Sequence, residues 1–357
     1  MGIQTPLIIN QVAGRIEELA AGDTLPGPLV EGYAGGNVLI NGDFDFWQRG
    51  DQFSNSNVYT ADRWYVQQGN VSGQLFWKHT PLAGETNFPD STYTFAINIT
   101  GNTSATSAFQ VFEQRVEDCR TFATKVSTLS FRVFNGGASG RKIAVEFGQT
   151  FGAGGSAAVL GISPEVFTLA AGMNYITKTV TMPSVGGKTA NFGHAAVVII
   201  WSSAGSDFNS RTANLGLQTG SLYFSQMKWE PGAVATPFRK RELALELVLC
   251  QRYYEKSYMP AVSPGTIDNQ GRRAFAVQPA MGGFLFCTQG FLVQKRATPS
   301  ITVYTAPGGV PGSVAQDDGS ARAVTVANQG VSSFELQWSN SAGRYGGWYH
   351  FTADAEI

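Results

Sequence analysis

The residue types that most often perform chemistry are few in this chain and stand far apart. The three histidines are His79, His194 and His350, and each lies in a different stretch that predicts a β-strand. None has a second ligand at the spacing of a metal-binding motif, and the chain contains no H-E-x-x-H. We therefore interpret the three imidazoles as structural groups and predict no metal site and no catalytic histidine.

Two other signatures of catalysis are incomplete. The stretch Gly186-Gly187-Lys188-Thr189 imitates the end of a phosphate-binding loop, but Met182 stands where that loop needs a glycine, so we expect a hairpin turn. No G-x-S-x-G elbow is present. Carboxylate pairs for glycoside hydrolysis meet in space and not in sequence, so a glycan-cleaving enzyme stays as the less favoured alternative. The sequence predicts a non-enzymatic protein without a cofactor.

Aromatic side chains are better candidates for a binding site. Tyr304, Tyr345 and Trp348 stand beside glycine-rich turns, where exposed rings could stack on the weakly apolar faces of sugars. We take these three as the candidate carbohydrate-binding residues; the alternative is that they pack in a core or a subunit interface. Four other tryptophans lie in apolar alternation or in motifs and are expected in the core: Trp47, Trp64, Trp201 and Trp229.

Composition indicates the fold class and excludes several partners. Charged residues make up 14% of the 357 positions, glycine occurs 42 times and aromatic residues reach 12%, which together are typical of an all-β protein. The net charge of −1 gives no broad positive field for nucleic acid or an acidic membrane. The basic run 239–241 is expected to be solvated or salt-bridged.

Cysteine usage and the absence of leader patterns indicate a cytoplasmic origin. Cys119, Cys250 and Cys287 are far apart and form no C-x-x-C pair, so we expect free thiols in a reducing compartment. Residues 1–16 lack the basic and apolar regions of a signal peptide. Apolar runs such as Ala195–Trp201 are far shorter than the roughly 18 residues of a membrane helix, so no membrane insertion is expected.

These residues must be positioned by two β-rich domains. From residue 37 to 236, short alternating runs such as Thr128–Phe134 are separated by turns rich in Gly, Asn and Pro, which predicts an antiparallel jelly-roll β-sandwich. Residues 259–357 predict a smaller C-terminal β-sandwich with short strands, including Phe291–Val293. Residues 1–36 are too few to bury a core of their own, so we expect them to be ordered by docking on a partner.

A connecting α-helix is expected within residues 237–258, from about Pro237 to Tyr254, because proline suits the first turn of a helix. Apolar residues follow two neighbouring stripes of this helix, so it should be buried on more than one side, between the two β-domains and between subunits. Three copies could pack such a helix near an axis, which predicts a homotrimer. The stripe residues are Leu243, Leu247, Cys250 and Tyr254, and Leu245, Leu249 and Tyr253.

Several motifs occur in a fixed order along the chain. Asn41-Gly42-Asp43-Phe44 precedes W-Q-R-G at 47–50 and Y-T-A-D-R-W at 59–64. W-E-P-G-x-x-A-T-P-F follows at 229–238, then L-C-Q-R-Y-Y at 249–254 and F-T-A-D-A-E-I at 351–357. In this order and spacing they resemble bacteriophage tail-fibre and related virion structural proteins. The resemblance covers the chain from about residue 37 onward.

The resemblance implies a place and a partner for the protein. It implies a virion protein, made in the host cytoplasm, that attaches to other virion proteins through residues 1–36 and binds a host-surface glycan; a capsid or tail decoration or connector protein without a receptor role is the alternative. The first β-domain also resembles the jelly rolls of carbohydrate-binding modules. By that resemblance Asp43 and Glu230 could share a structural calcium, against the alternative that each carboxylate caps the amides of a turn.

Overall fold

The computed structural model describes residues 7–10, 15–18, 36–82, 84–276, 283–306, 308–340 and 346–357. Antiparallel strands dominate these residues, which confirms the all-β prediction. The helical segments are short: η2 (Ser206–Phe208), α2 (Asn209–Thr212) and α3 (Leu243–Gln251). No helix in the described part of the chain has the length and apolarity to cross a bilayer. Near the start, β1 (Leu7–Asn10) pairs with β2 (Arg15–Glu18).

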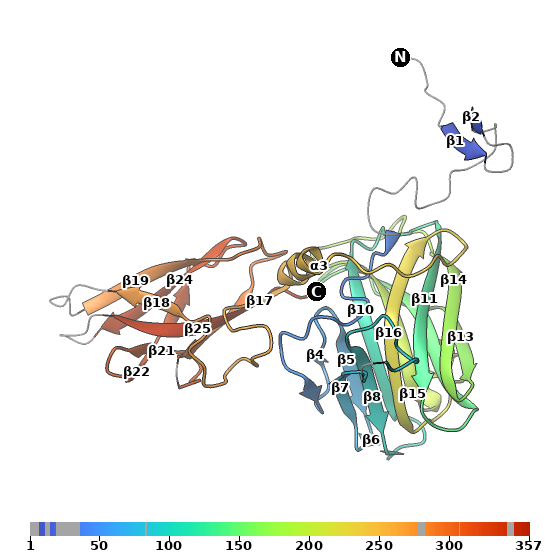
Figure 1. Cartoon of the computed structure of the whole chain (residues 1–357), viewed down its shortest axis with the longest axis horizontal. Helices are drawn as coiled ribbons and strands as arrows, with labels where there is room; N and C mark the ends of the chain where they lie inside the picture. The colour runs from blue at the N-terminus through green and yellow to red at the C-terminus, as the bar shows by residue number, and fades with distance from the viewer. Residues whose placement is uncertain are drawn as a thin grey trace.

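Two six-stranded sheets form the first domain, and Figure 1 shows them as the two layers of a sandwich. The layout confirms the predicted jelly roll. The front sheet contains, in spatial order, β14 (Gly172–Thr181), β11 (Val126–Asn135), β16 (Gly220–Pro231), β8 (Thr94–Ile99), β7 (Leu75–His79) and β3 (Gln52–Phe53). The back sheet contains β13 (Val159–Leu169), β12 (Arg141–Thr150), β15 (Ala195–Ala204), β10 (Phe109–Glu117), β5 (Tyr65–Gly69) and β4 (Val58–Tyr59). A small ribbon joins β6 (Val71–Ser72) to β9 (Gly101–Asn102).

The core of this domain lies between the two sheets and is rich in aromatic rings. On β11, Leu129, Phe131 and Val133 point inward and are fully buried, as their alternation predicts. Phe95 stacks on Phe44 at 5.2 Å between ring centres. All four tryptophans expected in the core are buried: Trp47, Trp64 and Trp229 lie between the sheets, and Trp201 lies in a second apolar cluster.

The outer face of the back sheet is also apolar and covered. All ten residues of β15 are buried, because its outward side chains Val197, Ile199 and Trp201 belong to a second apolar cluster. Phe208 of η2 packs on Trp201, with 5.1 Å between ring centres. The outer face of the front sheet differs from this covered face: its strands β11 and β14 present polar and half-buried side chains there.

The connecting helix is shorter than predicted. It begins at Leu243 and not at Pro237, with Glu242 as the N-cap whose side chain accepts the N–H of Leu245, and Tyr254 already belongs to strand β17. Residues before it stay extended because backbone carbonyls there, including those of Thr236 and Pro237, accept hydrogen bonds from Lys228.

The expected burial of this helix on several sides is also wrong for a single chain. The buried helix residues are Glu246 and Cys250, whereas Leu243 is 53% exposed and Val248 is 45% exposed. Glu246 is buried because it accepts the backbone N–H of Asn41 (2.6 Å) and pairs with Arg241 (3.0 Å). The helix is thus attached to the first domain by a polar contact.

The second domain is a smaller pair of sheets, which Figure 1 shows extending away from the sandwich beyond α3. Its core contains Val303, Phe334, Leu336 and Phe351. Residues 291–293, predicted as a strand, form no strand. The larger sheet centres on β25 (Gly346–Asp354), with β17 (Tyr254–Lys256), β18 (Arg273–Ala276), β20 (Ser300–Thr305), β21 (Ser313–Gln316) and β22 (Ala321–Ala323). The other contains β19 (Gly283–Gly290), β24 (Ser333–Asn340) and β23 (Thr325–Ala327).

Candidate functional site

The outer face of the front sheet carries a row of in-register aromatic side chains. Trp77 lies opposite Ala96, Ala96 opposite Tyr223, and Tyr223 opposite Phe134 on successive strands β7, β8, β16 and β11. The ring of Trp77 meets that of Tyr223 edge to face, with 5.7 Å between centres, and Phe134 lies 6.1 Å from Tyr223. These rings are half-buried, so they form an apolar strip on a face exposed to solvent.

The connection between β7 and β8 covers one side of this strip. Phe88, only 4% exposed, packs with its ring centre 5.8 Å from that of Phe134 and 6.4 Å from that of His79. The same connection is tied to the domain by Ser91, whose hydroxyl donates to Asp43 at 2.8 Å. It therefore forms a wall beside the sheet.

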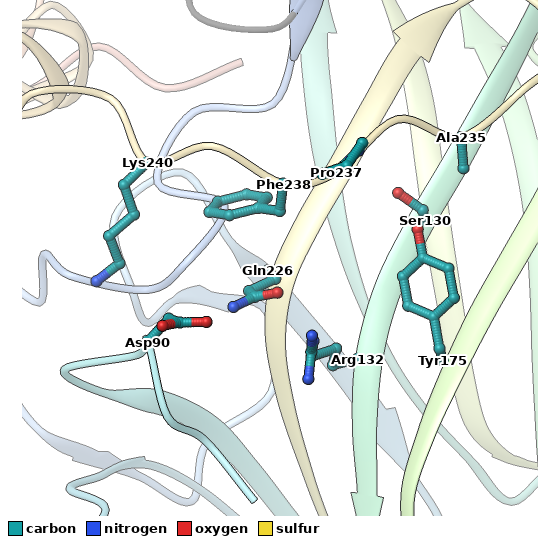
Figure 2. A pocket seen from close by; sticks show the side chains of 9 residues that line it. All are labelled: Asp90, Ser130, Arg132, Tyr175, Gln226, Ala235, Pro237, Phe238 and Lys240. Atoms are coloured by element: carbon teal, nitrogen blue, oxygen red, sulfur yellow. The ribbon is translucent and has the colours of Figure 1, made fainter.

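A pocket of about 500 Å³ lies beside that wall. Figure 2 shows the ring of Phe238 on one side of it and the ring of Tyr175 on another, with Arg132 and Gln226 between them. Tyr175, on β14, is 58% exposed. The lining residues are Asp90, Ser130, Arg132, Tyr175, Gln226, Ala235, Pro237, Phe238 and Lys240.

Hydrogen bonds and ion pairs hold residues 233–240, the segment that contains Phe238, against the front sheet. Glu230 accepts the backbone N–H of Thr236 at 2.8 Å and its hydroxyl at 2.7 Å, and Lys228 pairs with Glu230 at 2.9 Å. Further along, Lys240 pairs with Asp43 at 2.9 Å. These contacts keep residues 233–240 extended over the end of the front sheet, which forms the second wall of the pocket.

The floor of the pocket is polar. Arg132 on β11 lies opposite Tyr175 on one side and Ser225 on the other. At Gln226 the backbone adopts φ +55, and the pairing of β11 with β16 shifts register there, which is a β-bulge. The bulge breaks the alternation of β16 and lets Gln226 join Arg132 on the floor. Amide and guanidinium donors between two aromatic rings are the arrangement that holds a polar, ring-shaped ligand.

Acid–base chemistry has little support at this pocket. Its lining includes one carboxylate, Asp90, which is exposed, and contains no histidine, cysteine or second acid. Glycoside hydrolysis generally uses two carboxyl groups about 5–9.5 Å apart. Among the described residues, the lining of this pocket contains no such pair.

The predicted carbohydrate-binding residues lie elsewhere, on the second domain. Tyr304 on β20 lies opposite His350, and Trp348 stands two residues from His350 on β25, so the two rings share the outer face of one sheet. Both rings are half-buried. The ring centres of Tyr304 and Tyr258 are 6.0 Å apart, and the guanidinium carbon of Arg272 lies 4.4 Å from the centre of the Trp348 ring. Tyr345 lies outside the described residues. These two positions remain a second candidate face.

The three histidines differ in their surroundings. His350 is fully buried, stacks on Tyr258 at 3.8 Å and bonds Ser257, a structural role. His194 instead lies beside Asp118 and Cys119, a grouping that separation in sequence concealed. Its Nδ1 accepts the backbone N–H of Cys119 at 3.0 Å, and burial raises the pKa of the Cys119 thiol. Because that nitrogen is engaged and the thiolate is disfavoured, we assign no metal to this group.

Asp43 and Glu230 both accept backbone N–H groups, as in the alternative to a calcium site, but these amides lie at the bulge of β16 and in the extended segment 233–240 and not in turns. Asp43 accepts the backbone N–H of Gln226 at 3.1 Å, and burial raises the pKa of its carboxyl to about 6. Glu230 accepts the N–H of Thr236. The lysine partners described above, Lys240 and Lys228, supply the charge that a cation would otherwise contribute.

Comparison with known proteins found distant similarities to solved structures. No protein-family model matches this chain, and no curated protein matches it. A family 4 carbohydrate-binding module is 19% identical with a TM-score of 0.33, covering 54% of this chain and 98% of the module. A sugar-binding protein from Bacteroides thetaiotaomicron, described as putative, is 13% identical, with a TM-score of 0.34 and coverage of 55% and 100%. The enzymatically active domain of bacteriophage CBA120 tailspike protein 4 is 12% identical with a TM-score of 0.34; the match covers 55% of this chain but 21% of that domain.

Proposed function

We propose that this chain is a non-enzymatic structural protein of a bacteriophage virion, of the tail-fibre type, that attaches the particle to its host by binding a surface glycan. The observation that carries the binding role is the pocket on the front sheet, where Tyr175 and Phe238 flank the polar donors of Arg132 and Gln226. A sugar ring presents apolar C–H faces and a rim of hydroxyl groups, so rings beside hydrogen-bond donors fit its chemistry.

The assembly role is supported by surfaces that a single chain leaves open. On α3, Leu243, Leu245 and Val248 are 53%, 44% and 45% exposed, and an apolar helix face of this kind favours a homotrimer packed about these helices. The β1–β2 hairpin has two strands, which is marginal without a partner, so we propose that residues 1–36 dock on other virion proteins. Several weak sites on one particle would then act together.

The experiment for the receptor role is adsorption to host cells. Purified protein should bind host cells and a glycan array, and excess protein should block adsorption of the particle. If the protein binds no glycan and particles lacking it adsorb normally, the receptor role is wrong and the alternative of a decoration or connector protein remains. Electron microscopy separates these two, because a distal tail position suits a receptor binder and a shell or collar position suits decoration.

A further inference from the structure

Arg132 is a charged side chain without a partner in the protein. No hydrogen bond, ion pair or ring contact joins its guanidinium to any other residue in the part of the chain that the structure describes. It is half-buried on β11 and lines the pocket between Tyr175 and Phe238. A guanidinium carries five N–H donors and cannot lose its charge. A half-buried guanidinium without an acidic partner in the protein is therefore available to bind an anionic group of a ligand.

The other charges at the pocket do not neutralise it. Lys240 pairs with Asp43 and Asp45, at 2.9 and 3.2 Å, so its charge is already offset by two carboxylates. Asp90 lines the pocket, and no ion pair joins it to Arg132 among the described residues. Arg132 is therefore a positive charge on the floor of the pocket that pairs with no carboxylate among the described residues.

A second observation points to the same place. The hydroxyl of Ser225, a residue 1% exposed, has no hydrogen-bond partner, and Ser225 lies directly opposite Arg132 across β11 and β16. Buried hydroxyl groups are nearly always bonded, and an unpartnered one costs stability. The residue that pairs with Arg132 in the sheet thus also has a polar group without a partner, which is consistent with a polar ligand group at this position.

We propose that this pocket recognises a carboxylate-bearing sugar, such as a uronic acid unit of an acidic polysaccharide. The inference rests on the proposed glycan-binding function and specifies its ligand. The carboxylate accepts two N–H bonds from the planar guanidinium of Arg132, while the rings of Tyr175 and Phe238 contact the sugar. A lysine could supply the charge but not the paired geometry.

The experiment is a titration of the full chain with matched oligosaccharides. Each carboxylate-bearing oligosaccharide, for example an oligogalacturonate, is paired with its methyl ester, which keeps the sugar and removes the charge. Arg132→Gln should raise Kd for the acidic members at least tenfold and leave the esters unchanged, since it removes a charge-assisted pair. Arg132→Lys should keep part of the preference. Arg120→Gln, which removes an equal charge from an exposed loop residue, is the matched control.

The outcomes separate the two proposals. Preference for the acids that disappears in Arg132→Gln, with a thermal transition equal to that of the unsubstituted chain, supports the assignment. Equal binding of acids and esters, or unchanged binding by Arg132→Gln, overturns the acidic-sugar inference and leaves glycan binding intact. Binding to neither set, on an array that spans acidic and neutral sugars, contradicts glycan binding itself and the inference with it.

Discussion

The guanidinium of Arg63 lies 3.4 Å from the centre of the Tyr253 ring and pairs with Glu356. These three residues come from the first domain, the turn after α3 and the last residues of the chain. Arg63 is 1% exposed, so the contact is a buried ion pair covered by an aromatic ring. It joins the two β-domains at one point.

The same arrangement occurs a second time beside it. Arg49 lies 3.7 Å from the centre of the Tyr254 ring and pairs with Asp354 at 3.0 Å. Gln48 donates to the backbone oxygen of Tyr254 at 3.0 Å. The motifs W-Q-R-G, A-D-R-W, Q-R-Y-Y and A-D-A-E-I therefore meet at one joint. The residues of these motifs therefore connect the two domains. Arg132 and Tyr175 of the pocket lie outside all of these motifs.

Replacing Arg63 with methionine should destabilise this joint strongly. The change breaks the buried pair with Glu356, whose carboxylate keeps Arg49 as a partner at 3.3 Å. Breaking a buried pair costs about 3–5 kcal/mol, and because Arg49 remains we expect a loss of about 3 kcal/mol. Chemical denaturation should show the loss, and limited proteolysis should cut more readily between the domains. The exposed pair Arg120–Asp118 is the control, since Arg120→Gln should cost less than about 1 kcal/mol. Equal effects of the two changes would show that the joint contributes no special stability.

Gly42→Ala should destabilise the first domain by about 1–3 kcal/mol, because a Cβ there would lie 2.3 Å from the carbonyl oxygen of Met227, a backbone atom. Gly290 is the matched control: a Cβ at that position meets nothing within 4 Å, and its φ is not in the left-handed region. Gly290→Ala should therefore be neutral or slightly stabilising. Thermal unfolding of the two variants measures the difference in stability. A Gly42→Ala variant as stable as the unsubstituted chain would show that the backbone near Met227 shifts without cost and would contradict the prediction.

Stability should depend on pH through His350. Burial holds the pKa of this imidazole below its ordinary value, against the hydrogen bond to the Asp268 carbonyl, which raises it. As pH falls below about 6.5, the unfolded chain binds a proton that the folded chain excludes, so the free energy of unfolding decreases. The comparison is between the unsubstituted chain and His350→Asn, which lacks this titration. If the free energy of unfolding depends on pH in the same way in both proteins, His350 does not cause the loss of stability at low pH.

The exposed apolar face of α3 predicts that the chain self-associates and that substitutions on this face prevent the association. If Leu243 and Val248 pack against other copies, the chain should sediment as a trimer at micromolar concentration. Leu243→Ser together with Val248→Ser should yield monomers that unfold at nearly the same denaturant concentration, because both side chains are about half exposed in the single chain. Sedimentation of the unsubstituted chain as a monomer would contradict the trimer.

The fold class and most strands could be predicted from alternation alone, but β13 could not. This strand contains Gly161 and Ser163, both with positive φ, followed by Pro164, and its pairing with β12 shifts register twice. As the edge of the back sheet, it also has a mostly exposed, mixed pattern. Local bulges of this kind remove the period of two on which strand prediction depends.

The site could be predicted only in part. Alternation with Leu129, Phe131 and Val133 places Arg132 on the outer side of its strand. It does not indicate that Tyr175 lies across from it, because register between strands distant in sequence follows from the whole sheet. Phe238 enters the pocket because residues 233–240 stay extended, whereas the sequence predicted a helix from about Pro237. The extended course depends on the Glu230–Thr236 contacts, which helix periodicity does not report.

The most direct measurement compares the affinity of two single variants for one bound glycan by calorimetric titration. Tyr175→Ala removes the exposed ring of the front-sheet pocket, and Trp348→Ala removes the ring of the face on the second domain. We expect Kd to rise about fivefold for Tyr175→Ala and to stay unchanged for Trp348→Ala, since an aromatic contact contributes roughly 1 kcal/mol. Loss of affinity in Trp348→Ala with full affinity in Tyr175→Ala would contradict the assignment of the pocket as the ligand site.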